Sequence, residues 1–193
     1  MDQLKTVWNP ETVFSWSIVS VVEQRMQKWK KHMTFERAER APWVRIIPIN
    51  DAWELLLTKE RRSELNNGEW WYDIRLAGGK VFDSLTEYVD FKESWWDIAE
   101  AAMKAVTIEA REELWFMVSS MTHLHTSACW ATMRWDLYYF VVDAFHQLNE
   151  WQDLSELEDI EPFWASQEEV TKFCMDWSIS EDRSAAVLLR YLQ

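Results

Sequence analysis

Residues 127–151 read SACWATMRWDLYYFVVDAFHQLNEW, and this stretch decides the predicted fold. Apolar side chains recur along it at the spacing of one helix face: Trp130, Met133, Leu137, Val141, Ala144, Leu148 and Trp151. A stripe with this period is typical of a helix that buries one side against a core. The sequence therefore predicts one long helix over residues 127–151.

Helical spacing or helix-capping residues continue on both sides of this stretch. They predict further helices over residues 9–33, 51–65, 93–106, 108–123, 166–177 and 180–192. The clearest start is at Ser166, because Glu169 three residues later completes a capping box. Most of the chain is therefore expected to be helical.

A small β element is expected in the first half of the chain. Residues 42–49, PWVRIIPI, are a short apolar run bounded by prolines, which indicates an edge strand. Residues 70–76 and 81–82 flank Gly78-Gly79 and indicate a hairpin with a tight turn.

The predicted fold class is mainly α (α+β): a helical bundle with a two- or three-stranded antiparallel β element in the N-terminal half. We expect one domain over residues 1–193, because this length suits a single core. Residues 1–85 would carry a helix and the β element, and residues 86–193 would form the bundle.

Composition argues against several classes of protein. With only three Gly, the chain has neither GxGxxG nor GxxxxGK[ST], so we expect no Rossmann-type or P-loop nucleotide site. No uncharged apolar run approaches the roughly 20 residues that span a bilayer, and the first residues lack the pattern of a signal peptide. Cys129 and Cys174 form no close pair and are expected to be reduced. We therefore expect a cytoplasmic protein.

Charge and aromatic content favour an interaction surface. Residues 135–171 hold ten Asp and Glu but no Lys or Arg, in a chain whose net charge is −13. Fifteen Trp are more indoles than a core of this size holds, so several are expected at the surface. Exposed Trp beside an acidic surface is typical of a protein interface, and negative charge attracts basic partners while repelling nucleic acid.

The main functional hypothesis is thus a non-enzymatic acidic binding module without a cofactor. It would be an inhibitor of the immunity or phage anti-defence type, engaging a basic, nucleic-acid-handling protein. We expect no direct contact with nucleic acid or membrane. The sequence leaves open whether the protein forms a homodimer. The candidate partner-binding residues lie on the polar face of the predicted helix and just beyond it: Asp136, Tyr139, Asp143, His146, Glu150, Asp153 and Glu156. An ordinary solvated face has the same pattern.

An alternative hypothesis is a metal site. Glu109-Ala110-Arg111-Glu112 places two carboxylates on one side of the predicted helix over residues 108–123. If this helix and the next form an antiparallel hairpin, these carboxylates come level with Asp143. Carboxylate oxygens are the ligands that Mg²⁺ prefers in proteins.

This arrangement resembles the all-α nucleoside triphosphate pyrophosphatases, including the dimeric dUTPases. Those enzymes pair an ExxE helix with an ExxD helix around magnesium and attack a phosphate with activated water. Residues 142–146 would stand for the second motif, with Phe140 in place of its leading acid; a second register pairs Glu87-Tyr88-Val89-Asp90 with Glu109–Glu112. The resemblance implies a Mg²⁺-dependent pyrophosphatase with Glu109, Glu112 and Asp143 as ligands.

Overall fold

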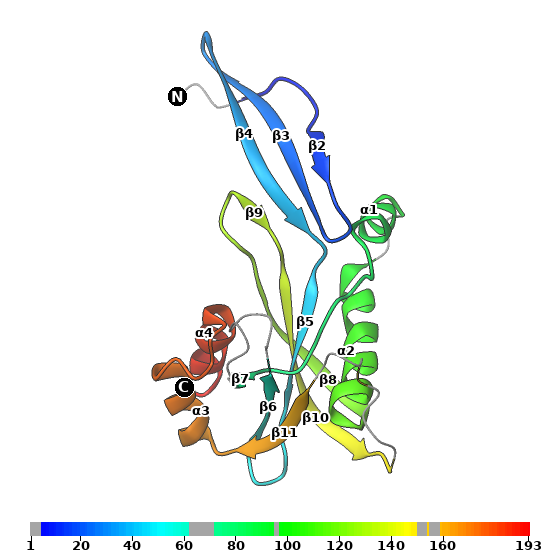
Figure 1. Ribbon diagram of the computed structural model, residues 1–193, viewed down its shortest axis with the longest axis vertical. Helices are drawn as coiled ribbons and strands as arrows, with labels where there is room; N and C mark the ends of the chain where they lie inside the picture. Colours follow the sequence, from blue (N-terminus) through cyan, green and yellow to red (C-terminus); the bar gives the residue numbers. More distant parts are fainter. Residues whose placement is uncertain (1–4, 62–71, 95–96, 150–153, 155–158) are drawn as a thin grey trace.

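The fold is that of a computed structural model, which describes residues 5–61, 72–94, 97–149, 154 and 159–193 (Figure 1). Its strands are β1 (Lys5–Thr6), β2 (Glu11–Ser15), β3 (Val19–Lys28), β4 (Lys31–Arg40), β5 (Trp43–Pro48), β6 (Leu55–Arg61), β7 (Tyr72–Arg75), β8 (Phe116–Ser127), β9 (Met133–Arg134), β10 (Leu137–Gln147) and β11 (Ile160–Ala165). Its helices are α1 (Leu85–Glu93), α2 (Ile98–Leu114), α3 (Gln167–Met175) and α4 (Asp182–Tyr191). Strands hold 46% of the described residues and helices 27%, so the predicted helical bundle is wrong.

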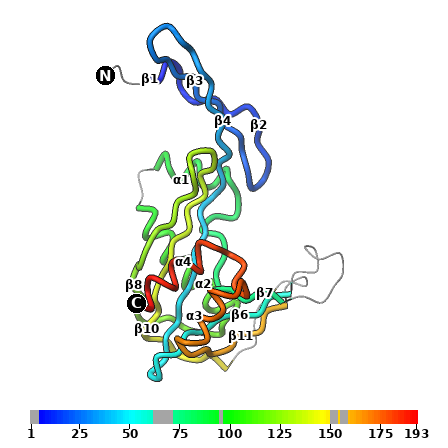
Figure 2. The backbone as a smooth tube through the Cα atoms, turned by 90° about the vertical axis from the view of Figure 1, so that its left-hand side faces the viewer, coloured from blue at the N-terminus to red at the C-terminus, as the bar shows by residue number. Residues whose placement is uncertain are grey.

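The strands form three sheets in two regions of the molecule. Strands β1, β3, β4 and β9 make one sheet in that order, with β2 also paired to β3. Strands β1 to β4, here called the arm, project away from the rest of the protein, here called the body (Figures 1 and 2). The body contains the sheets β5-β10-β8 and β11-β6-β7.

The body is layered, with strands between helices. Successive strand residues point to opposite faces, so Val44 and Ile46 of β5 pack toward α2, whereas Ile47 packs toward α3 and α4 (Figure 1). Strand β10 is divided in the same way: Phe140 lies in the core beside α2 and Tyr139 in the core beside α4. Each of these strands is therefore buried on both faces.

Burial on both faces explains the error over residues 127–151. The run from Leu137 to Val142, LYYFVV, is apolar throughout because β10 is a central strand, parallel to β5 and antiparallel to β8. A continuous apolar run satisfies helical spacing as well as strand burial, so its period does not separate the two.

Some of the other predicted helices and strands are wrong, and others are confirmed. Two further predicted helices are strands in the structure: residues 9–33 lie in β2, β3 and the start of β4, and residues 51–65 contain β6. The predicted helix over residues 108–123 is half right, because residues 108–114 are the end of α2 and residues 116–123 are the start of β8. The strand at 42–49 is confirmed as β5, and the helices at 166–177 and 180–192 are confirmed as α3 and α4. The capping box of Ser166 and Glu169 is confirmed too.

The Gly78-Gly79 hairpin is also wrong, and its replacement matters for the site. Strand β7 pairs with β6, and the residues after it run antiparallel along β5. The Val44 amide donates to the Gly79 carbonyl at 2.9 Å, and the Ile46 amide donates to Ala77 at 2.9 Å. Gly78 has φ +132°, and a Cβ there would overlap the Val44 carbonyl, so this close approach requires glycine. We call residues 77–80 the glycine segment.

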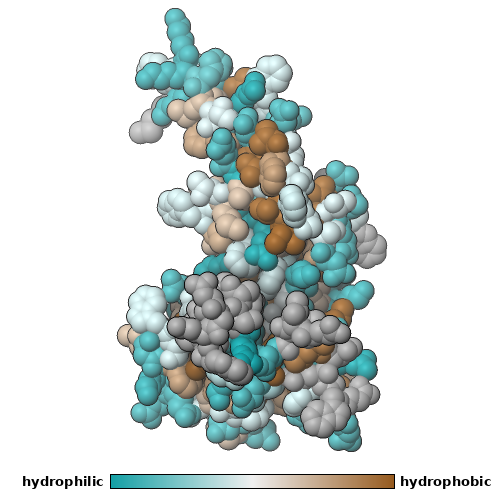
Figure 3. All heavy atoms as spheres, viewed as in Figure 1, coloured by the Kyte–Doolittle hydropathy of each residue, from teal (hydrophilic) through white to brown (hydrophobic). Residues whose placement is uncertain are grey.

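Two surface predictions can be compared with the described residues. Several Trp are largely exposed, as expected: Trp8, Trp16, Trp29, Trp53, Trp130 and Trp177. The space-filling view also has apolar side chains at the surface over the arm (Figure 3). Among the helices of the described part of the chain, none has the length and apolar character needed to cross a membrane.

Candidate functional site

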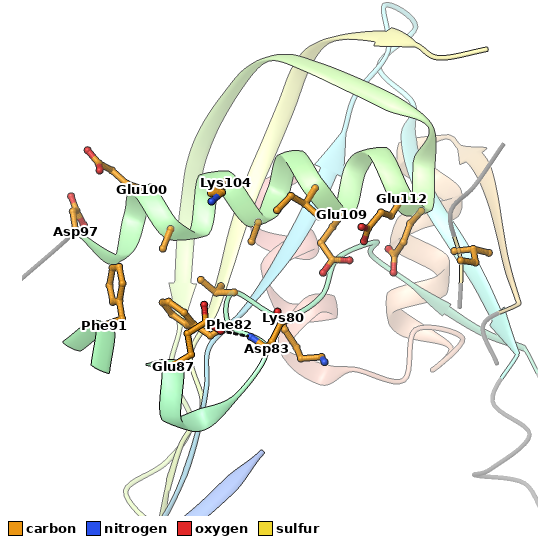
Figure 4. A pocket seen from close by; sticks show the side chains of 16 residues that line it. Lys80, Phe82, Asp83, Glu87, Phe91, Asp97, Glu100, Lys104, Glu109 and Glu112 are labelled. Atoms are coloured by element: carbon orange, nitrogen blue, oxygen red, sulfur yellow. Dashed lines mark hydrogen bonds between the residues drawn. The ribbon is translucent and has the colours of Figure 1, made fainter. Parts of the chain in front are cut away.

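A cavity of about 920 Å³ lies along α2, between this helix, α1 and the glycine segment (Figure 4). Seven carboxylates and two ammonium groups line it among the described residues: Asp83, Glu87, Asp97, Glu100, Glu109, Glu112, Glu113, Lys80 and Lys104. A hollow with this excess of negative charge attracts cations. Its size suits a ligand of nucleotide dimensions.

Three of these carboxylates form a row on one side of α2. Glu109, Glu112 and Glu113 are spaced three and four residues apart, which brings them to the same face of a helix. Glu109 and Glu112 extend from α2 on the side of the segment that carries Lys80 (Figure 4). The row therefore faces the glycine segment.

Gly79 makes room for this row. A Cβ at Gly79 would overlap the Glu109 carboxylate, so only glycine allows that carboxylate to lie directly against the backbone. Any larger residue at position 79 would push Glu109 out of its place.

Glu113 is the most enclosed member of the row. It is 9% exposed and accepts a hydrogen bond of 2.8 Å from the Gly78 amide at Oε2. Burial, followed by the neighbouring charge of Glu109, raises the pKa of Glu113 to about 8, against the opposing effect of the Gly78 hydrogen bond. Without a cation, Glu113 therefore holds a proton near neutral pH.

The carboxylates of the row suit a Mg²⁺ ion better than a structural metal ion. Within the described ranges, no three His, Cys, Asp or Glu side chains are gathered tightly enough to form a ready metal cage. A structural metal would need such a cage, whereas Mg²⁺ commonly takes one or two carboxylates, keeps several waters and shares the phosphates of a substrate. The row thus fits a Mg²⁺ ion that binds together with a phosphorylated ligand.

The predicted metal ligands are only partly brought together. Glu109 and Glu112 lie in the cavity, but Asp143 is not among its lining residues. Asp143 is exposed on β10, near enough to Tyr191 of α4 to raise the pKa of that phenol, after the larger effect of burial. In the second register, Glu87 lines the cavity and Asp90 does not. The all-α arrangement of ligands is therefore wrong.

The predicted partner-binding face is not present as a helix face, because β10 replaces the helix. Tyr139 is fully buried, and its hydroxyl lies 3.2 Å from Ser184 Oγ. Asp143 and His146 are exposed and Asp136 is half-buried. Glu150, Asp153 and Glu156 lie outside the described residues, so a partner-binding role for the surface residues stays a prediction.

The acidic segment is also less uniform than its sequence indicates. Asp159 lies 3.5 Å from Arg61, and Glu161 lies 3.9 Å from Lys59, with both cations contributed by β6. Sequence reasoning gave no role in the site to Gly79 or to Glu113. Glu113 follows Glu112 and lies four residues after Glu109, so helical spacing alone could have found it.

Comparison with known proteins gives a match in structure only. No family model and no curated protein sequence matches this chain. A crystal structure of an ADP compounds hydrolase superimposes with a TM-score of 0.69 at 18% identity, covering 98% of this chain and 92% of that chain. At this identity the likeness establishes the fold alone, over both the arm and the body. It gives no support to the inhibitor hypothesis.

Proposed function

We propose that this protein is a cation-dependent hydrolase that cleaves the diphosphate linkage of a nucleoside diphosphate compound. The observation that carries the proposal is the row of Glu109, Glu112 and Glu113 facing the glycine segment in an acidic cavity. The similarity to an ADP compounds hydrolase supports the substrate class, because the cavity lies within the shared fold.

The chain's own residues have distinct roles in this proposal. Glu109 and Glu112 would hold Mg²⁺, and Gly79 leaves the space that the Glu109 carboxylate occupies. When bound, the ion supplies Lewis-acid polarisation of a phosphate and lowers the pKa of water. Lys80 and Lys104 line the same cavity and would offset the charge of the substrate's phosphates.

The overall reaction is hydrolysis. The oxygen of water forms a bond to one phosphorus of the diphosphate, the bond from that phosphorus to the bridging oxygen breaks, and the proton of water is released to a base. The products are two phosphate monoesters. Positioning and electrostatics carry most of the catalysis in reactions at phosphorus, which suits a site made of a few carboxylates and backbone amides.

This proposal keeps the magnesium hydrolase of the alternative hypothesis and changes its structure. The site is built on a single helix and a glycine segment, and the glycine segment takes the place across the cavity that the sequence assigned to Asp143. The cytoplasmic location and the homodimer stay predictions.

The test is release of a phosphate monoester from ADP-linked sugars and dinucleotides by the purified protein with Mg²⁺. We expect activity that EDTA removes and that Glu112→Gln lowers by about a hundredfold or more, because the variant loses a charged metal ligand. Glu168→Gln is the matched control, since Glu168 is exposed at the start of α3 and outside the cavity. Equal activity of the two variants, or an activity indifferent to EDTA, would refute the assignment.

A further inference from the structure

Arg45 is a buried charge at the centre of the body. It lies on β5, and its side chain is 1% exposed. Its Nε donates to Glu181 Oε2 at 2.9 Å, and its Nη1 donates to the Gly78 carbonyl at 3.1 Å. Burying a guanidinium is costly unless its partners are fixed in place, so these contacts constrain one another.

Glu181 anchors Arg45 to the C-terminal helix. Glu181 is the N-cap residue of α4 but makes no side-chain capping bond, because its carboxylate is engaged elsewhere. Glu181 Oε2 accepts from Ser184 Oγ at 2.8 Å as well as from Arg45. Tyr139 then joins the network through Ser184, and both are buried. The first turn of α4 is therefore linked to the central sheet through Arg45.

Arg45 also holds the glycine segment from the side opposite to α2. The Gly78 carbonyl accepts from Arg45, while the Gly78 amide donates to Glu113 Oε2 at 2.8 Å. The next residue, Gly79, lies against the Glu109 carboxylate. A rotation of the peptide group after Gly78 would thus disturb the backbone that contacts both carboxylates.

We propose that Arg45 is a positioning residue that fixes the Gly78 carbonyl and so holds the glycine segment against the carboxylate row of α2, with α4 as its anchor. The inference rests on the proposed function for its catalytic consequence. Its structural part, the orientation of Gly78, is independent of any activity.

The composition of the chain offers a sharp structural test. The protein contains only three glycines, so ¹⁵N-glycine labelling gives three backbone amide resonances, those of Gly68, Gly78 and Gly79. In Arg45→Met we expect the Gly78 and Gly79 resonances to move and their hydrogen exchange to speed up by about tenfold, as loss of one buried hydrogen bond implies. Glu181→Gln should cause a smaller change in the same direction. It is the variant to measure if Arg45→Met does not fold.

Arg183→Met is the matched control. Arg183 also contacts Glu181, at 3.7 Å, but it donates hydrogen bonds to Cys129 and to the Trp135 carbonyl and not to the glycine segment. We expect this variant to leave Gly78 and Gly79 unchanged. Unaltered glycine resonances in a folded Arg45→Met protein, or equal changes in Arg183→Met, would overturn the proposal.

The catalytic consequence is measured separately, by activity assays on the whole chain. Arg45→Met should raise the Mg²⁺ concentration for half-maximal rate by about tenfold, as loss of a residue that orients metal ligands does, with a smaller effect in Arg183→Met. If the unmodified protein hydrolyses no diphosphate compound, the proposed function fails while the glycine resonances still decide the role of Arg45. If the enzyme is active and its Mg²⁺ dependence is the same in both variants, the catalytic consequence is refuted.

Discussion

Glu113→Gln is expected to stabilise the metal-free protein in alkaline solution and to change its stability little in acid. The pKa of Glu113 is raised from the ordinary 4.5 to about 8, first by burial and then by Glu109. Between pH 4.5 and about pH 8, the Glu113 carboxyl is ionised in the unfolded chain and still protonated in the folded chain. The free energy of unfolding therefore falls as pH rises: the contribution of the protonated carboxyl is complete below the unfolded pKa and is lost as pH passes through about 8.

The size of the effect follows from the two pKa values. Each pH unit between them costs about 1.4 kcal/mol, which gives an upper limit of about 5 kcal/mol for the whole interval. The raised pKa already contains the response of the interior to the charge, so most of this limit, about 4 kcal/mol, is expected between about pH 5 and about pH 9. Gln removes the titration and keeps an oxygen that can accept from the Gly78 amide.

The assay is urea unfolding followed by Trp fluorescence, in EDTA, at about pH 5 and about pH 9. We expect Glu113→Gln to gain about 4 kcal/mol relative to the natural sequence between the two pH values. Glu168→Gln, at an exposed position, should follow the natural sequence throughout. A constant difference between Glu113→Gln and the natural sequence across this range would refute the argument, because it would mean that Glu113 titrates alike in both states.

Two further predictions concern local structure. Gly79→Ala should lower Mg²⁺-dependent activity by about tenfold or more with little loss of melting temperature, because its Cβ displaces the Glu109 carboxylate. Gly78→Ala should lower the melting temperature strongly, because its Cβ meets the Val44 carbonyl and its φ is +132°. Similar melting temperatures for the two variants would contradict this pair of predictions. Ser166→Ala should cost about 1 kcal/mol in urea unfolding by removing the capping box of α3, and an unchanged midpoint would show that the cap contributes nothing.

Helix α3 and strand β10 show what local spacing can and cannot predict about this fold. Helix α3 has an exposed face, and its capping box is written in adjacent residues, so its position followed from local chemistry. Strand β10 has no exposed face over residues 137–142, and its apolar run therefore carries no period. Its pairing with β5 joins residues nearly a hundred positions apart, which local spacing does not encode.

The candidate site was half predictable for a similar reason. Glu109 and Glu112 were identified under a wrong fold, because three-residue spacing places them together on any helix that contains them. Their counterpart across the cavity was assigned to Asp143 by assuming a helical hairpin. The actual counterpart is a backbone segment at Gly78-Gly79, which depends on pairing along β5 and has no side chain to identify it.

The path of the backbone also explains why the acidic run of residues 135–171 does not mark the position of the acidic cavity. Clustering along the sequence becomes clustering in space only when the backbone keeps those residues on one face, as the turns of α2 do for its carboxylates. The acids of residues 135–171 lie partly on strands, where neighbours point to opposite faces, and two of them meet cations from β6. The carboxylates that line the cavity come instead from residues 83–113, where four are carried by one helix and the others by the chain just before it. In this fold, therefore, a short helical row is a better guide to the candidate cation site than a large local excess of charge.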